Sequence, residues 1–236
     1  MPVDKSNERV QKMFAAIAPR YDRLNHILSL QADRYWRWRT VRTVSCYLQG
    51  PVLDVCTGTG DLALAFYRRT RGAHEIVGAD FCAPMLEIGR QKSQAVGANG
   101  RIQFIEADAQ QLPFADESFA VVSVAFGLRN VADTDQGLRE MTRVCRHGGC
   151  VVVLEFSQPT FPPFAAIYGW YFRHVLPRVG QWLASNDQEA YCYLPQSVGE
   201  FPSGGALAAR MEQTGLKNVR YYPLTFGVAT LYVGEK

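Results

Sequence analysis

A glycine-rich turn between an apolar run and a helix-compatible segment is the first stretch of this sequence that could hold a ligand. Residues 52–55 read as a short buried strand, and residues 61–71 read as a helix. Gly58 and Gly60 lie between them and permit close approaches that a side chain would block. The first N–H groups of a helix have no partner within the helix, so they are available to a polar ligand. The stretch predicts a nucleotide-like ligand bound by Asp54, Gly58 and Gly60.

An acidic residue follows at the spacing of a dinucleotide site. Asp80 lies twenty residues after Gly60, where its carboxylate could accept hydrogen bonds from both hydroxyls of a ribose. The pattern Gly58-x-Gly60-x-x-Ala63 also satisfies the loose dinucleotide fingerprint, with alanine in the last position. These residues fit NAD and S-adenosylmethionine equally well. An ordinary strand–helix turn with an incidental aspartate is a third interpretation.

The residues after the third predicted strand favour S-adenosylmethionine. Asp108 and Ala109 follow the apolar run 102–106 and precede Leu112-Pro113-Phe114. An acidic side chain here could accept a hydrogen bond from an adenine amino group, and the adjacent backbone could pair with the ring.

The elements that must position these residues alternate from residue 51 onward, which is typical of a doubly wound α/β sheet. The predicted strands are 51–56, 75–80, 101–106, 119–125 and 149–156, and the predicted helices are 61–71, 84–96 and 133–145. A helix at 203–214 precedes strands at 217–223 and 226–233, whose link is too short for a crossover, so these two must be antiparallel. The result is a Rossmann-like, seven-stranded, mostly parallel sheet with one reversed strand, the form of a class I methyltransferase.

The N-terminal region reads as helical before the first strand, with breaks at Pro19 and around Ser29. We expect residues 1–48 to form a helical cap and residues 49–236 to form one methyltransferase unit.

Composition indicates a soluble, cytoplasmic protein. The 236 residues are 47% hydrophobic, no secretory signal opens the chain, and no apolar run approaches the length of a spanning helix. Six cysteines show neither a CxxC pair nor histidine-spaced clusters, so we expect no metal site. A net charge of +3 is too small to indicate nucleic acid, although it suits occasional contact with anionic lipid.

An aromatic stretch at residues 161–182 permits two interpretations. Tyr168, Tyr171 and Phe172 recur at helical spacing beside Arg173 and Arg178. Such a face is most often core, but beside basic residues it also suits a membrane surface or a long prenyl tail.

Several motifs resemble the ubiquinone/menaquinone biosynthesis C-methyltransferases over nearly the whole chain. The N-terminal match is Tyr21-Asp22-x-Leu24-Asn25-x-x-Leu28-Ser29, closing with Trp36. Phe126-Gly127-Leu128-Arg129-Asn130-Val131 is the most diagnostic run, and Arg143-Val144-Cys145-Arg146-His147-Gly148-Gly149, continuing to Leu154-Glu155-Phe156-Ser157, is a third match. The order and spacing of these motifs together are highly specific.

The resemblance implies an S-adenosylmethionine-dependent enzyme that methylates a ring carbon of a prenylated quinol. It assigns cofactor contacts to Thr59, Asp80, Asp108 and Ala109. Ala125 stands where some members use a serine, which puts that contact in doubt. Asp33 stands where many members have histidine, which favours the menaquinone pathway over the dual-function enzymes. Peripheral membrane contact and a homodimer are further expectations, and nucleic acid is not an expected partner.

The residues expected to act on the acceptor are Arg129, Asn130, Tyr21 and Asp22. Arg129 and Asn130 follow the fourth strand at the edge where α/β sheets bind ligands. Because its neighbours are apolar, Arg129 requires a specific partner, either a surface carboxylate or a quinol oxygen that becomes phenolate. We expect Arg129 to supply the positive field and a water held by Tyr21, Asp22 or Asn130 to relay the proton. Alternatively, Asp22 is a helix N-cap.

Two rival functions remain at this point. One is a small-molecule O- or N-methyltransferase with an apolar acceptor. The other is a catalytically silent S-adenosylmethionine-binding subunit.

Overall fold

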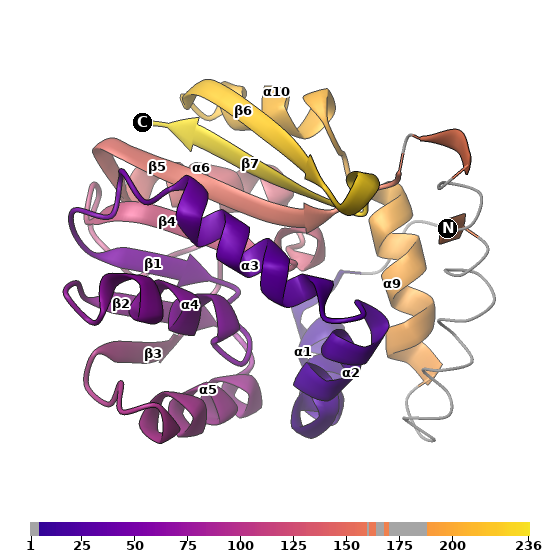
Figure 1. Ribbon diagram of the computed structural model, residues 1–236, viewed down its shortest axis with the longest axis horizontal. Coiled ribbons are helices and arrows are strands. Elements are labelled where there is room, and N and C mark those ends of the chain that lie inside the picture. Colours follow the sequence, from indigo (N-terminus) through magenta and orange to yellow (C-terminus); the bar gives the residue numbers. More distant parts are fainter. Residues whose placement is uncertain (1–4, 160, 164–167, 170–187) are drawn as a thin grey trace.

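The computed structural model describes residues 5–159, 161–163, 168–169 and 188–236, and its centre is a seven-stranded sheet (Figure 1). The strands are β1 Val52–Val55, β2 Ile76–Asp80, β3 Ile102–Glu106, β4 Phe119–Ala125, β5 Cys145–Phe156, β6 Lys217–Leu224 and β7 Ala229–Glu235. Their order is β3-β2-β1-β4-β5-β7-β6. Only β7 pairs antiparallel with its neighbours, β5 and β6. The predicted mostly parallel sheet with one reversed strand is confirmed.

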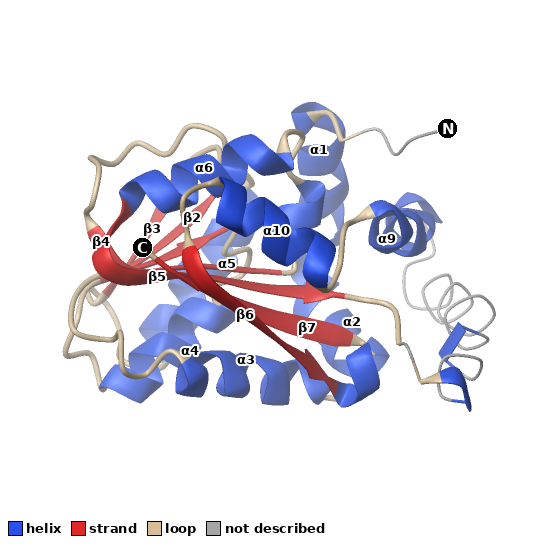
Figure 2. Ribbon diagram, turned by 90° about the horizontal axis from the view of Figure 1, so that it is seen from above, coloured by secondary structure: helices blue, strands red, loops and turns tan. Residues whose placement is uncertain are grey.

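Helices cover both faces of the sheet, as Figure 2 shows from above. They are α3 Ala32–Thr43, α4 Asp61–Thr70, α5 Ala83–Ala95, α6 Thr134–Val144 and α10 Gly205–Gln213. One apolar core joins α3, α4 and α5 to the sheet, and a second joins α6 and α10 to the opposite face. Residues 151–154 of β5 are fully buried, because a strand covered on both faces has no solvent side for a polar residue.

The helices before β1 take two different positions. They begin with α1 Asn7–Ile17, the 3-10 turn η1 Ala18–Arg20 and α2 Tyr21–Leu28, so the breaks predicted at Pro19 and Ser29 are confirmed. Figure 1 shows α1 and α2 beyond the carboxyl ends of β1 and β2, whereas α3 lies along the sheet. Trp36 of α3 is 2% exposed and belongs to the core. The domain division at residue 48 stays a prediction.

Two sequence expectations need correction, and one helix was not predicted. Helix α6 ends at Val144 and β5 begins at once at Cys145, before the Gly148-Gly149 pair that was expected to open the strand. The extra residues are absorbed where the β4–β5 register shifts, and Gly148 has a φ of 73° there. The last link is the 3-10 turn η4 Thr225–Gly227, so β7 begins at Ala229 and not at residue 226. Helix α9 Gln188–Glu200, which contains Pro195, was not predicted.

Most of the aromatic stretch 161–182 lies outside the described residues, and so does its helical stripe apart from Tyr168, which packs against the core of the α3 face. No helix in the described part of the chain has both the length and the apolar character that crossing a bilayer requires.

Candidate active site

The glycine loop between β1 and α4 has the geometry that the sequence predicted. Gly58 and Gly60 have φ values of 55° and 78°, in the left-handed region that favours glycine. A Cβ built on Gly60 would lie 2.7 Å from the ring of Phe104, so a side chain there would clash. A Cβ on Gly58 would meet nothing within 4 Å, which leaves space above the loop.

Asp54 holds this loop from beneath. Its carboxylate is 1% exposed and accepts hydrogen bonds from the hydroxyls of Thr57 at 2.6 Å and Ser123 at 2.9 Å. Burial raises the pKa of Asp54 to about 7, although these hydrogen bonds oppose the shift.

Asp80 and Asp108 come together at the carboxyl edge of the sheet. Asp80 accepts hydrogen bonds from the backbone N–H groups of Gly58 at 2.8 Å and Cys82 at 2.9 Å, and burial raises its pKa to about 6. Asp108 accepts from the backbone N–H of Gln110 at 2.9 Å and from Nδ2 of Asn7 at 3.0 Å. Each carboxylate retains lone pairs for a further donor.

A pocket of about 50 Å³ lies between these carboxylates and the N-terminal helices. Its lining includes six residues that the sequence singled out: Tyr21, Gly58, Asp80, Asp108, Ala109 and Asn130. A second pocket of about 50 Å³ shares Tyr21 and Gly58 and adds Asp54 and Thr59. The structure therefore brings most of the predicted residues to one cleft. Gly60, Asp22 and Arg129 line neither pocket.

Arg129 is buried beneath the cleft and has a partner inside the protein. It is 5% exposed, and its Nη1 donates to Oε2 of Glu155 at 2.9 Å. It also donates to the carbonyl of Phe126, and its guanidinium lies 5.2 Å from the ring centroid of Phe156. Glu155 is 1% exposed, so the interpretation of a surface carboxylate is wrong. The requirement for a specific partner is met by a residue of this chain.

Asn130 and Tyr21 face the cleft with different chemistry. Oδ1 of Asn130 is buried and has no hydrogen-bond partner among the residues that the structure describes, while its Nδ2 lies 3.5 Å from the carbonyl oxygen of Phe126. Burial raises the pKa of the Tyr21 phenol, although Arg129 acts in the opposite direction. Tyr21 is therefore protonated at neutral pH and can donate, while Asn130 can accept.

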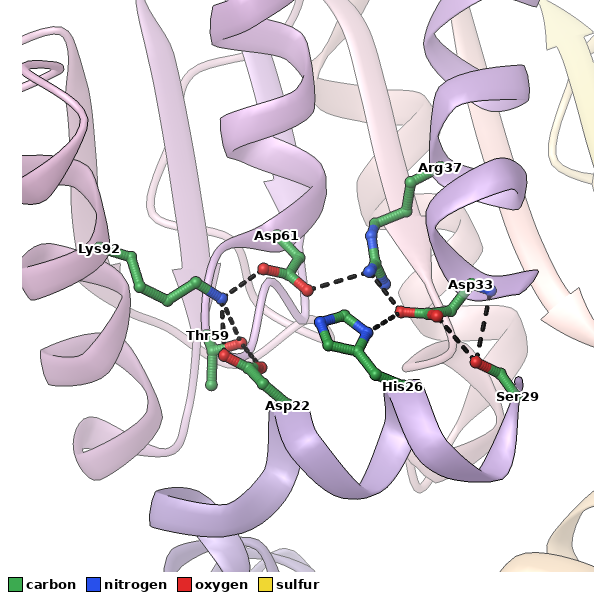
Figure 3. A network of polar contacts seen from close by, with 8 residues as sticks. All are labelled: Asp22, His26, Ser29, Asp33, Arg37, Thr59, Asp61 and Lys92. Carbon is green, nitrogen blue, oxygen red and sulfur yellow. Dashed lines mark hydrogen bonds and ion pairs between the residues drawn. The ribbon is translucent and has the colours of Figure 1, made fainter. Parts of the chain in front are cut away.

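Asp22 connects the N-terminal helices to the glycine loop. It lies in the first turn of α2, whose N-cap is Arg20, so the N-cap interpretation is wrong. Its carboxylate accepts from the hydroxyl of Thr59 at 2.6 Å and from Nζ of Lys92 at 2.8 Å. Lys92 also bonds to Asp61 (Figure 3).

The same network continues to α3. Arg37 bridges Asp61 at 3.0 Å and Asp33, while Asp33 also contacts Nδ1 of His26 at 2.7 Å and accepts from Ser29 at 2.7 Å. Burial alone would raise the pKa of Asp33, but Ser29 and Arg37 hold it below its usual value. Within the described residues, His26, Asp33 and Asp61 place ligand atoms within 4.8 Å of one another. Arg37 and Lys92 already neutralise these carboxylates.

Sequence reasoning missed Glu155, Lys92, Asp61 and Arg37 as parts of this region. Glu155 stood in a quoted motif without a role, and Asp61 could have been noted as the acidic residue in the first turn of a helix. Lys92 lies 70 residues from Asp22, and no local pattern joins them.

The reversed β7, the glycine loop and the acidic cleft define a class I methyltransferase. The chain belongs to the ubiE/COQ5 methyltransferase family, which it matches over residues 3–236. It is 47% identical over 232 residues to the ubiquinone/menaquinone biosynthesis C-methyltransferase UbiE of Geotalea daltonii, covering 98% of each chain. It is 49% identical over 224 residues to the demethylmenaquinone methyltransferase of Thermus thermophilus, covering 95% of this chain and 100% of that one.

A solved SAM-dependent methyltransferase of Thermotoga maritima shares the fold. It has a TM-score of 0.62 and 16% sequence identity, and the match covers 95% of this chain and 98% of that one. The predicted family, fold and class of enzyme, an S-adenosylmethionine-dependent methyltransferase, are confirmed.

Proposed function

We propose that this protein is an S-adenosylmethionine-dependent C-methyltransferase that converts demethylmenaquinol to menaquinol. The observation that carries the proposal is full-length similarity to enzymes named for this reaction, combined with a cleft that holds the expected residues. Relatives at comparable identity carry the ubiquinone/menaquinone name, so a dual-specificity enzyme is the second candidate.

The cleft residues fit the cofactor. Asp80 would accept from the ribose hydroxyls, Asp108 and the backbone of Ala109 would meet the adenine, and Thr59 with the loop at Gly58 would hold the methionine end. Asp80 and Asp108 are acceptors suited to hydroxyl and amino donors, and the open space above Gly58 admits a ligand against the backbone. When bound, S-adenosylmethionine supplies an electrophilic methyl group.

Entry of the cofactor requires the N-terminal helices to move. The two pockets of about 50 Å³ are far smaller than the roughly 300 Å³ or more of a typical ligand site. Asn7, Phe14 and Tyr21 form the wall contributed by α1 and α2. Opening this wall breaks the hydrogen bond between Asn7 and Asp108, which is exposed to solvent.

The acceptor ring would lie against Tyr21, Phe126 and Asn130. Attack through a ring carbon requires electron density from the quinol oxygen, which is greatest when the hydroxyl proton is withdrawn. The buried Oδ1 of Asn130 would accept a hydrogen bond from that hydroxyl, and the Tyr21 phenol would donate to the same oxygen as it becomes negative. The hydroxyl proton would leave to water, and the proton of the methylated ring carbon would follow when the ring regains aromaticity. Arg129, neutralised by Glu155, acts by fixing the turn from Phe126 to Asn130. Asp22 positions Thr59.

A two-substrate assay tests the function. The purified protein is incubated with methyl-labelled cofactor and either a short-chain demethylmenaquinol or a methoxy-benzoquinol of the ubiquinone type. Methylation at a ring carbon of the naphthoquinol alone is expected. Equal methylation of both establishes dual specificity, whereas transfer to a heteroatom or cofactor binding without transfer refutes the proposal.

Attachment to the membrane as a peripheral protein of the cytoplasm is part of the proposal, because a prenylated acceptor resides in the bilayer. The homodimer stays a prediction, and light scattering of the full chain measures it directly.

A further inference from the structure

A wide basic groove lies between α3 and α4, outside the cofactor cleft. Its volume is about 1180 Å³. Its lining carries six arginine or lysine side chains and two carboxylates, so it concentrates more positive charge than the net +3 of the whole chain. The two helices lie side by side on the near side of the molecule in Figure 1 and along its lower side in Figure 2.

Four of these arginines have no carboxylate partner in the described part of the chain. Arg37 and Lys92 are engaged in the network of Figure 3. Arg34, Arg42, Arg68 and Arg69 are exposed, and none of them forms an ion pair with another described residue. Like charges gathered in one groove repel one another, and an external anion removes that repulsion.

Exposed aromatic side chains border the same arginines, and an exposed leucine lies in the turn before α3. Arg34, Trp38 and Arg42 follow one another at four-residue spacing along α3, so they form one row on its surface. Trp38 is 52% exposed, and it stacks on Tyr35 with ring centroids 6.0 Å apart and lies under the Arg42 guanidinium at 5.3 Å. Leu30, in the turn before α3, is 82% exposed.

This combination favours a bilayer surface over a soluble anion. A free phosphate needs only the cations, whereas arginine beside exposed tryptophan, tyrosine and leucine is the composition of interfacial helices. Anionic headgroups would meet Arg34 and Arg42, and Trp38 and Leu30 would enter the boundary between headgroups and acyl chains. We propose that the α3–α4 groove docks the protein on membranes containing anionic lipid.

The position of the groove connects docking to the site. Asp61 lines both the groove and the pocket that contains Thr59, and Asp22 lies in the groove wall. A bilayer seated on this face therefore reaches the helices that cover the cleft. That consequence rests on the proposed function, whereas the docking itself does not.

Flotation of the full-length protein with phosphatidylcholine vesicles, with and without phosphatidylglycerol, tests the inference. We expect binding only to the anionic vesicles and its loss at high salt. The variant R34Q/R42Q removes two surface charges and should weaken this binding about 30-fold, since each basic side chain near an anionic surface contributes about 1 kcal/mol. The matched control R101Q/K217Q removes two exposed charges at the amino edge of the sheet and should bind like the parent.

A second variant separates apolar insertion from charge. Trp38→Ala should weaken binding while leaving its salt dependence unchanged, because every arginine remains. Equal losses of vesicle binding in R34Q/R42Q and R101Q/K217Q would show that net charge alone controls binding and would overturn the inference. So would failure of the parent to bind anionic vesicles, or groove binding of inorganic phosphate without vesicle binding.

Methyl transfer to a short-chain, water-soluble demethylmenaquinol distinguishes this inference from the proposed function. R34Q/R42Q should keep parental turnover with that substrate and lose turnover with a long-chain quinol in vesicles. If the parent transfers no methyl group to the soluble quinol, the proposed function fails while the vesicle result stands.

Discussion

The buried pair of Arg129 and Glu155 gives a test of what Arg129 does. The two side chains are 6% and 1% exposed, and one Nη1–Oε2 contact of 2.9 Å joins them. Glu155→Leu leaves the guanidinium without its counter-charge, which should lower the free energy of unfolding by about 3–5 kcal/mol. At about 2–4 °C per kcal/mol for a chain of this size, the melting temperature should fall by about 6–20 °C.

The double variant Arg129→Met/Glu155→Leu removes both charges. The backbone N–H groups of Arg129 and Phe156 donate hydrogen bonds to the Glu155 carboxylate at 3.2 and 3.1 Å, and in the double variant they still lose this acceptor. We therefore expect a loss of about 2 kcal/mol, smaller than for the single Glu155 variant.

Activity of the double variant then decides between positioning and direct catalysis. If Arg129 positions the turn that carries Asn130, the double variant should keep part of its turnover, and R129A should lower turnover far more than cofactor affinity. Urea unfolding, calorimetric titration of the cofactor and single-turnover methyl transfer supply the three readouts. A Glu155→Leu variant that loses less than about 1 kcal/mol refutes the buried-pair reasoning. Unchanged turnover in R129A removes Arg129 from the mechanism.

Three further predictions concern the cleft. Asp80→Asn should weaken cofactor binding about 30- to 100-fold, measured by calorimetry, because the ribose hydroxyls lose a charged acceptor. Gly60→Ala should lower the free energy of unfolding by about 2–4 kcal/mol in urea, because φ is 78° and the new methyl group meets Phe104. The raised pKa of Asp54, about 7, favours protonation in the folded state, so stability present near pH 4 should decline as pH rises through 7. Asp54→Asn should remove that decline. If the dependence of stability on pH is unchanged in this variant, the decline belongs to another titrating group.

The sheet was predictable because its signals are local. Apolar runs bounded by turn residues marked the strands, and the short link before β7 required an antiparallel pair. The glycine loop and Asp80 follow from the same local logic, since a strand, a tight turn and a helix start fix where these residues lie.

The features that could not be predicted from the sequence depend on contacts between distant residues, which no local pattern encodes. Helix α9 continues through Pro195, which a reader of the sequence takes as a helix end. The strand at Cys145 begins inside a segment whose glycines indicate a turn, because pairing with β4 extends it. Lys92 meets Asp22 only after α5 and α2 have packed around the same loop.

The position of Arg129 changes how the site handles charge. A cation among apolar residues needs a partner, and the sequence leaves open which residue this is. In the structure the partner of Arg129 is Glu155 of β5. Burial raises the pKa of the Tyr21 phenol and Arg129 still acts to lower it, but the charge of Arg129 is paired with Glu155, so we expect uncharged groups to supply most of the stabilisation of the oxygen. In the proposed mechanism the Tyr21 phenol, kept protonated by burial, would donate to this oxygen, and Asn130 Oδ1 would accept from its hydroxyl. Replacing Tyr21 with phenylalanine should therefore slow methyl transfer at every pH without shifting the pH profile, whereas a titrating base at this position would produce a shift.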